Sequence, residues 1–359
     1  MRVVAGVDCH KSTHTVVFLN TIGEMLGYLT FPTTHEGYET ALEMGKSLGC
    51  SSWGIEGSGL YGFAFAVSIE AEGATVHEVP GLYTKRHRRQ SSHRGKSDLN
   101  DARAIAEVVL REEGRLSRFY LATLQRGLRM RYDQRDRFVR ERTSAANRLR
   151  SAALLLSVSK LPKDITSTRA ARRLRLAAAT FRSAAEADVA MSAVLDELED
   201  AAEAIERINV SVRHIERIIR SMVRDIAPEL LDLHGVSDVA AAGLIGHSGD
   251  IRNCRNAASF AMRCGAAPIQ CSSGRTEAVR VNLGGNRQLN RLLHIASIAQ
   301  IRSATHPGRK YYERKRAEGK THLAALRCLK RTLATVVFYR LRQVAERLEQ
   351  DELASQIAA

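Results

Sequence analysis

The chain has few of the features that mark zinc fingers, secreted folds or membrane spans. Its six cysteines, at positions 9, 50, 254, 264, 271 and 328 of 359 residues, form no CxxC pair and no Cys/His grouping with zinc-finger spacing. Reduced thiols inside a cell are therefore expected. The first residues, MRVVAGVDCH, lack the apolar core of a signal peptide, and no uncharged run is long enough to cross a bilayer. The sequence predicts a soluble cytoplasmic protein with no membrane partner.

Acidic residues are scarce relative to basic ones. The chain has 39 Asp and Glu against 54 Lys and Arg, for a formal net charge of +15, and 44 of the 54 are Arg. Guanidinium groups match phosphate geometry, so the charge favours a nucleic-acid partner. A genome of biased base composition would also raise the Arg content, and charge alone leaves both explanations open. The basic residues are spread along the chain rather than gathered on one amphipathic helix, which disfavours an acidic membrane surface.

The first part of the chain, residues 1–115, predicts an α/β domain with a mixed sheet. Three β-rich runs come first, and helices and strands then alternate. The expected strands are 2–8, 14–20, 23–31, 51–56 and 74–79, and the expected helices are 35–47, 61–72 and one that begins at the N-cap Ser97.

The rest of the chain reads as mainly helical. Residues 116–226 contain two long helical segments, and from Met191 to Met222 apolar residues recur in steps of three and four. This period is typical of a coiled coil, either between two copies of the chain or antiparallel with the helix over 124–153. A long helix packed on its own domain is the alternative. A second, mainly helical globular unit is expected over 227–345, followed by an exposed tail over 346–359.

Four acids stand where a metal site would form in such a sheet. Asp8 and Glu56 each close a predicted strand, and Asp98 and Asp101 lie on one face of the helix that begins at Ser97. If the two strands are neighbours, all four carboxylates converge, and clustered carboxylates usually need a divalent cation such as Mg²⁺. Taken singly, each acid is equally compatible with a turn cap or an exposed surface.

Basic residues near these acids are candidates for nucleic-acid contacts. Lys11 and His14 follow Asp8, and Arg94 and Lys96 precede the helix that carries Asp98. Phosphate contacts and a solvated surface are both open for Lys11 and His14.

The segment CSSGRT places Ser272 and Ser273 before Gly274 in a predicted loop. A serine beside glycine is ordinarily a turn residue, and no histidine with an evident base role lies in the motif. Nearby positive charge favours a phosphate ligand here, and we include Arg275, Arg287 and Arg291 among the candidate nucleic-acid contacts. The residue pattern alone leaves the turn and the nucleophile both open.

Six motifs in order resemble the insertion sequence 110 family of DEDD transposases, RNA-guided recombinases. They cover the chain from Val4 to about Arg342 and read GVDCHKSTH, GIEGSG, GKSDLNDARAIA, GAAPIQCSSGRT, LGGNRQLNRLLH and YYERKRAEGKTHLAALRCLKR. The resemblance implies a RuvC-like domain with the ribonuclease H fold, a helical coiled-coil insert and a C-terminal transposase domain.

The resemblance also implies roles for particular residues. Asp8, Glu56, Asp98 and Asp101 would hold Mg²⁺, and Ser273, rather than Ser272, would attack a DNA phosphodiester to form a phosphoserine link. The implied partners are donor and target double-stranded DNA, a structured bridge RNA that pairs with both, and further copies of the chain. Dimers would join into a tetramer in the bacterial cytoplasm, associated with the nucleoid when active, with acids and serine from different subunits.

Two other functions fit the same residues. A Holliday-junction-like endonuclease would use the four acids and a metal-activated water, with Ser273 only structural. A nucleic-acid-binding scaffold would use the acids only to support the fold.

Overall fold

The structure is a computed structural model that describes residues 2–84, 97–119, 123–158, 161–182, 188–271 and 279–358. The chain forms two compact units, Met1–Leu121 and Ala122–Ala359. The first unit contains the predicted domain 1–115. Residues 116–121, which the sequence placed in the next segment, also belong to the first unit. The second unit contains the rest of the predicted segment 116–226 and the segment 227–345, whose separation into two domains stays a prediction. In the described part of the chain, no helix is both long and apolar enough to cross a membrane.

The first unit is built on a six-stranded mixed sheet with the order β3-β2-β1-β4-β5-β6. The strands are β1 Val3–Cys9, β2 Thr13–Leu19, β3 Met25–Pro32, β4 Cys50–Glu56, β5 Thr75–Glu78 and β6 Ser117–Arg118. β1 pairs in parallel with β4, and β4 with β5, whereas the other neighbours are antiparallel. An antiparallel meander followed by parallel crossovers is the ribonuclease H arrangement, so the predicted fold class is confirmed for this unit.

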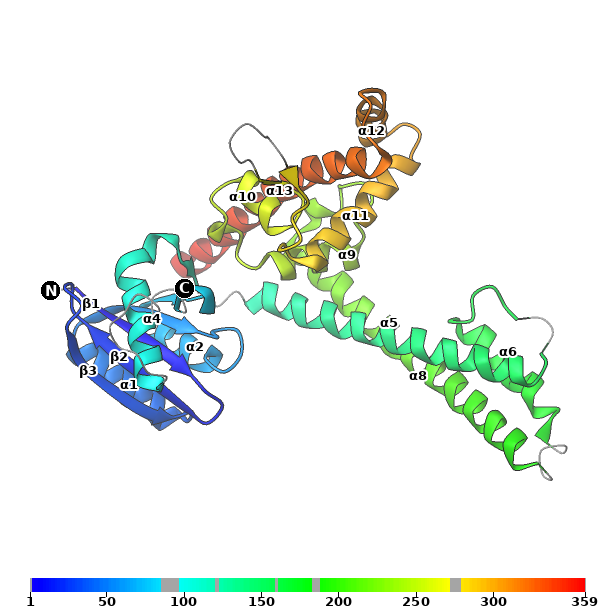
Figure 1. The fold of residues 1–359 in the computed structure, drawn as a ribbon, viewed down its shortest axis with the longest axis horizontal. Helices are drawn as coiled ribbons and strands as arrows, with labels where there is room; N and C mark the ends of the chain where they lie inside the picture. The colour runs from blue at the N-terminus through cyan, green and yellow to red at the C-terminus, as the bar shows by residue number, and fades with distance from the viewer. Residues whose placement is uncertain are drawn as a thin grey trace. The chain divides into compact units, whose positions relative to one another are not determined.

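Helices cover both faces of the sheet (Figure 1). α1 His35–Ser47 and α2 Phe63–Ala71 share one apolar core with the sheet, and α4 Asp98–Glu112 forms a second core on the other face. β1 is apolar on successive residues because both of its faces are buried, and four successive residues of β4, at 52–55, are buried as well. A short 3-10 helix, Glu113–Arg115, follows α4 and leads into β6.

Two glycines let α4 lie directly on the sheet. Gly6 of β1 and Gly54 of β4 are register partners in the middle of the sheet. A Cβ on Gly6 would stand 2.1 Å from the Ala106 N atom and 2.3 Å from the Ala102 O atom, both in the α4 backbone. A Cβ on Gly54 would stand 2.3 Å from Val109 Cγ2 of the same helix. The distance between helix and sheet therefore depends on the absence of side chains at these two positions.

The second unit begins with a pair of long antiparallel helices, α5 Thr123–Leu155 and α8 Val189–Ile226 (Figure 1). Polar pairs along the interface fix the opposed direction: Arg135 bonds Glu216, Arg142 bonds Asn209 and Arg148 bonds Glu197. α6 Thr168–Ala179 packs on α8 and closes an apolar core with both helices. The antiparallel pairing with the 124–153 helix is thus observed. Association of two copies through this stripe stays a prediction.

Most of the remaining elements form one core with the adjoining ends of α5 and α8. They are the 3-10 helices Pro228–Leu230 and Ile251–Asn253 and the helices α9 Asp238–Ser248, α10 Ala257–Arg263, α11 Arg287–Arg302 and α13 His322–Ala358. The helix α12 Pro307–Ala317 packs on α11 and α13, and the two-residue strands β7 Ile269–Gln270 and β8 Val279–Arg280 pair with each other.

The segment predicted as an exposed tail, 346–359, is helical as far as Ala358, because α13 continues to that residue; its status as a separate tail stays a prediction. The sequence from His322 to that residue contains neither glycine nor proline, so no residue type in it stops a helix. Arg347 also ties this stretch to the unit, since its Nε atom donates to Glu229 at 3.0 Å.

Candidate active site

Asp8 and Glu56 lie side by side at one edge of the sheet. They are register partners at the carboxyl ends of the parallel strands β1 and β4, so the condition on which the metal-site hypothesis depended, that these strands are neighbours, is met. The carboxyl ends of parallel strands at a change in strand order are where open α/β sheets bind ligands. The Asp8 side chain is only 14% exposed, so its carboxylate is largely shielded from solvent.

Helix α4 brings two more acids to this edge. Ser97 caps the helix, as predicted, and its Oγ atom accepts a hydrogen bond from Asn100 N at 3.2 Å. Asp98 and Asp101 both lie in the first turn, three residues apart and therefore on one face. The position of this turn follows from the close contact of α4 with Gly6.

His10 completes the cluster. Its Nε2 atom lies 3.3 Å from Asp8 Oδ2 and 3.3 Å from Asp98 Oδ1. Asp8, His10 and Asp98 each offer a possible ligand atom, and the three atoms lie within 4.8 Å of one another. Our sequence reasoning missed His10. The turn from β1 into β2 reverses directly after Asp8, with His10 N donating to Thr13 O at 3.0 Å, and such a turn keeps the next polar residue near the strand end.

The electrostatics reflect this crowding. Burial is the main cause that raises the pKa of Asp8 above its ordinary value, and His10 opposes the rise. The negative charges of Asp101, Asp98 and Glu56 raise the pKa of Asp8 further, in that order. All three of these acids therefore lie close enough for their charges to act on Asp8.

The Glu56 carboxylate is held from its other side. Thr84 Oγ1 donates a hydrogen bond to Glu56 Oε2 at 3.0 Å. A Cβ on Gly81 would stand 2.7 Å from Glu56 Oε1, so the glycine leaves room for this carboxylate. Thr84 is a second residue that sequence reasoning missed, since only the folded chain brings it to β4.

The cluster fits a divalent cation. Asp8 Oδ2 is buried, and apart from its contact with His10 Nε2 at 3.3 Å it has no hydrogen-bond partner among the described residues. A buried carboxylate oxygen without a donor is costly unless a cation neutralises it. The donor set, carboxylate oxygens with one imidazole nitrogen, suits a hard divalent ion. The fold and the acidic cluster around Asp8 thus imply a divalent metal, whereas its binding by all four acids, Asp8, Glu56, Asp98 and Asp101, and its identity as Mg²⁺ stay proposals.

His14 and Lys11, the two basic candidates that follow Asp8, differ in their exposure to solvent. His14 was predicted to contact phosphate or to lie on a solvated surface, and both expectations were wrong, because the side chain is fully buried. Its ring stacks on Tyr38 at 5.9 Å and meets Phe31 edge-on at 5.7 Å. Burial lowers the pKa of His14, which keeps the ring neutral in this aromatic core. Lys11 is exposed, and its phosphate contact stays a prediction.

Several candidate residues lie outside the described residues, namely Arg94, Lys96, Ser272, Ser273 and Arg275. The described chain on either side of the two serines is ordered as a small hairpin, in which Ile269 pairs with Arg280 and Gln270 with Val279. The roles of these five residues stay predictions.

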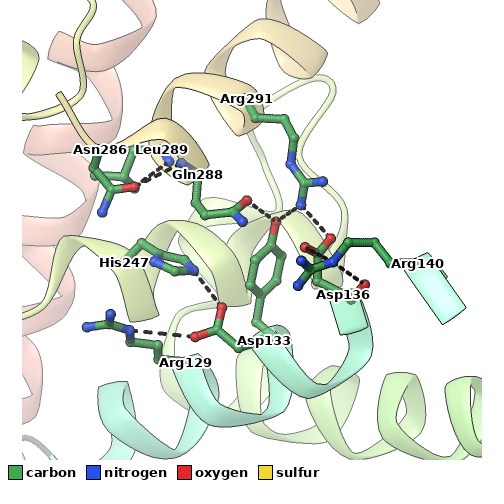
Figure 2. A network of polar contacts seen from close by, with 10 residues as sticks. Arg129, Asp133, Asp136, Arg140, His247, Asn286, Gln288, Leu289 and Arg291 are labelled. Carbon is green, nitrogen blue, oxygen red and sulfur yellow. Dashed lines mark hydrogen bonds and ion pairs between the residues drawn. The ribbon is translucent and has the colours of Figure 1, made fainter. Parts of the chain in front are cut away.

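Arg291 takes part in a network that joins three helices of the second unit (Figure 2). Its Nη2 atom donates to Asp136 Oδ1 at 2.7 Å and to the Tyr132 hydroxyl at 2.6 Å, both on α5. Figure 2 also shows Asp133 of α5 bonded to His247 of α9, at 3.0 Å. The Arg291 guanidinium is thus engaged within the protein, and Arg287, at the start of α11, is exposed. Phosphate contacts by either residue stay predictions.

A second polar network holds the far end of α4. Glu113 accepts hydrogen bonds from Arg2 and from Ser52, and His77 Nε2 lies 3.1 Å from Glu113 Oε1. Burial lowers the pKa of His77 from 6.5, although the negative charge of Glu113 opposes the change. This network fixes the helix at the end opposite the acids.

Comparison with protein families gives two matches along the chain. Residues 5–158 match the IS110 DEDD domain model, which is described as "Transposase". Residues 227–313 match the model described as "Transposase IS116/IS110/IS902 family". The two matches fall in the order expected from the six sequence motifs.

Two curated proteins and two solved structures are also similar to this chain. The uncharacterized 44.8 kDa protein of insertion element IS116 from Streptomyces clavuligerus is 26% identical over 386 residues, with 95% of each chain covered. The uncharacterized 43.6 kDa protein of IS110 from Streptomyces coelicolor is 38% identical over 118 residues, 33% of this chain and 29% of that one. Among solved structures, Thermus thermophilus RuvC matches at 17% identity over 33% of this chain and 99% of its own, with a TM-score of 0.27. The same enzyme with a Holliday junction substrate matches at 14% identity, over 30% of this chain and 90% of its own, with a TM-score of 0.24.

Proposed function

This chain belongs to the IS110 family of transposases, and we propose that it cuts and rejoins DNA through a covalent phosphoserine bond to Ser273. Asp8, Glu56, Asp98 and Asp101 hold Mg²⁺ beside the reacting phosphate. A structured bridge RNA pairs with donor and target DNA and so selects the sites. The subunits act as dimers that join into a tetramer, in which one subunit supplies the acids and another the serine.

The observation that carries this proposal is the meeting of acids at the sheet edge in a chain with both transposase regions. Asp8 and Glu56 are register partners, and Asp98 lies with Asp8 around His10. A divalent cation bound there would place positive charge beside phosphate oxygens. The net charge of +15, carried mostly by Arg, suits backbone contacts to both RNA and DNA.

The chemical step exchanges one phosphoester for another. The Ser273 hydroxyl loses its proton as its Oγ atom bonds to the phosphorus, and the bond from phosphorus to a DNA sugar oxygen breaks. That oxygen leaves with a proton. A hydroxyl of the second DNA then attacks the phosphorus, and the serine oxygen departs and regains a proton. No external energy source is required, because the number of phosphoester bonds does not change.

The test uses a nicked suicide DNA substrate, from which the leaving strand is lost after cleavage, with the element's RNA and Mg²⁺ present. We expect wild-type protein to form a protein–DNA adduct and Ser273→Ala to form none. Ser272→Ala is the matched control, and it should form the adduct because the neighbouring hydroxyl is not the nucleophile.

Other results would identify the other functions. Metal-dependent cleavage that persists in Ser273→Ala would indicate a Holliday-junction-like endonuclease with water as nucleophile. An absence of cleavage with RNA and DNA both bound would indicate a nucleic-acid-binding scaffold.

A further inference from the structure

A pocket of about 420 Å³ lies beside the β7–β8 hairpin in the second unit. Its lining comes from the segment after α10, from β8 and the residues that follow it, and from α12, α13 and the connection between them. Small and apolar side chains form much of this lining: Ala266, Ala267, Pro268, Val281 and Ala324. The pocket therefore offers an apolar surface large enough for one planar ring system.

Positive charge surrounds this apolar surface. Arg280, Lys320, Arg327 and Arg331 all line the pocket, and no acidic residue is among the described lining residues. None of the four forms an ion pair with a carboxylate in the described ranges, and Arg331 Nη1 donates to Ala257 O at 3.3 Å. A pocket with four cations and no acid among its described lining residues favours an anionic ligand.

An aromatic ring also lines the pocket. Tyr311 of α12 is half-buried, and the Arg314 guanidinium and the Lys315 ammonium lie 5.1 Å and 5.6 Å from its ring centroid. Cation–π contacts of this kind help to hold a ring in position. An aromatic ring beside a cationic groove is the usual platform for an unstacked base.

We propose that this pocket takes one unstacked nucleotide of the DNA strand that Ser273 attacks, with the base on the apolar surface and Tyr311. The cations bind the adjoining phosphate. This inference rests on the proposed function, in which pairing with the bridge RNA separates the DNA strands, because a base can enter the pocket only after it leaves the duplex. A continuous duplex presents only its backbone and groove edges, so its stacked bases could not contact the apolar interior of the pocket.

The length of chain between Ser273 and the pocket limits which nucleotide of the strand can enter the pocket. Val279 lines the pocket and lies six residues after Ser273 in the chain. Six residues span at most about 22 Å when fully extended. Since a DNA strand rises 3.4 Å per nucleotide, the bound nucleotide lies within about six positions of the reacting phosphodiester.

Cys328 supplies a native reporter, since this free, half-buried thiol lines the pocket. The experiment measures alkylation of each cysteine by peptide mass spectrometry in full-length Ser273→Ala protein, saturated with a single-stranded 12-mer, the same sequence as duplex, or a 12-mer of abasic sites. We expect the single strand to slow alkylation of Cys328 about tenfold or more, since stacking and phosphate contacts both favour occupancy. Duplex and abasic strands should protect it little. Cys50, half-buried in the first unit, is the matched control and should be unaffected.

Affinity measurements on variants test whether binding of the single strand depends on the residues that line the pocket. Arg327→Ala and Tyr311→Ala should each weaken binding of the single strand about tenfold. Arg213→Ala removes an exposed charge from α8, away from the pocket lining, and should weaken it much less. Ala324→Leu fills the pocket without a change of charge and should abolish the difference between normal and abasic strands.

Three results would overturn the inference. They are equal protection of Cys328 by duplex and single strand, full protection by a free deoxynucleotide at equal concentration, and equal losses of affinity in Arg327→Ala and Arg213→Ala. Because no readout requires cleavage, the pocket and the nucleophile are tested separately. An adduct on Ser273 without protection of Cys328 would contradict the pocket alone, and protection without an adduct would contradict the proposed function alone.

Discussion

Replacement of Gly6 by alanine would place a methyl group inside the backbone of α4. The added Cβ would stand 2.1 Å from Ala106 N and 2.3 Å from Ala102 O, whereas ordinary contacts begin at 3.4 Å. The helix must therefore move away from β1 by about 1 Å, and overpacking of this kind costs about 1–3 kcal/mol. In a unit of about 120 residues, this corresponds to a fall in melting temperature of about 4–12 °C.

The same movement would carry Asp98 and Asp101 away from Asp8. We therefore expect added Mn²⁺ or Mg²⁺ to raise the melting temperature of the Gly6→Ala protein less than that of wild type. Trp53 of β4 is the single tryptophan of the chain, so its fluorescence reports unfolding of the first unit.

Gly114→Ala is the matched control for this prediction. A Cβ there would meet no atom within 4 Å, and the backbone of Gly114 does not have a positive φ. This variant should melt within about 1 °C of wild type, as expected for a surface change. A Gly6→Ala protein with the melting temperature and cation response of wild type would refute the claim that this glycine positions the acids.

The other predictions concern single side chains. The pKa of His77 is lowered from 6.5 by burial, so the unfolded chain binds a proton first and the stability of the first unit should fall as pH drops below about 6.5. His77→Gln should show a smaller fall in melting temperature between pH 7.5 and 5.5, and an equal fall would count against this cause. Arg291→Ala leaves the Asp136 carboxylate, whose side chain is 8% exposed, without its closest cation. The free energy of unfolding measured by urea denaturation should therefore fall by about 1–3 kcal/mol. An unchanged urea midpoint would contradict this expectation. Asp101→Asn should abolish strand exchange in a recombination assay while RNA affinity by filter binding stays near wild type, and unchanged recombination would remove the argument for the metal site.

Much of the first unit could be predicted from local sequence. The apolar run before Asp8 has the length and composition of a buried strand, the shorter stretch 53–55 precedes Glu56, and both acids stand near the ends of these strands. Ser97 is a strong N-cap residue, and it fixes where α4 starts and therefore which residues occupy the first turn. Local preferences and the overall fold agree at these positions.

For a strand that is buried on both faces of the sheet, the sequence does not show which side chains lie on which face. β2 is buried on six successive residues, so no alternation shows which side chains lie on which face. For this reason His14 could not be recognised as a core residue. His10 was overlooked for another reason, because it lies in the turn between β1 and β2, and only the folded turn shows that its side chain lies beside Asp8. The partner of Arg291 was equally hidden, since Asp136 lies 155 residues away in the sequence and meets Arg291 only because α5 and α11 both pack against α9.

The attachment site of DNA on the protein tests the central claim most directly. Protein trapped on the nicked substrate would be digested with protease and nuclease, and the modified peptide would be sequenced by mass spectrometry. The proposed mechanism predicts a nucleotide linked through phosphate to Ser273, in wild-type protein but not in Asp101→Asn. Attachment at another residue, or DNA cleaved without any attached peptide, would contradict it.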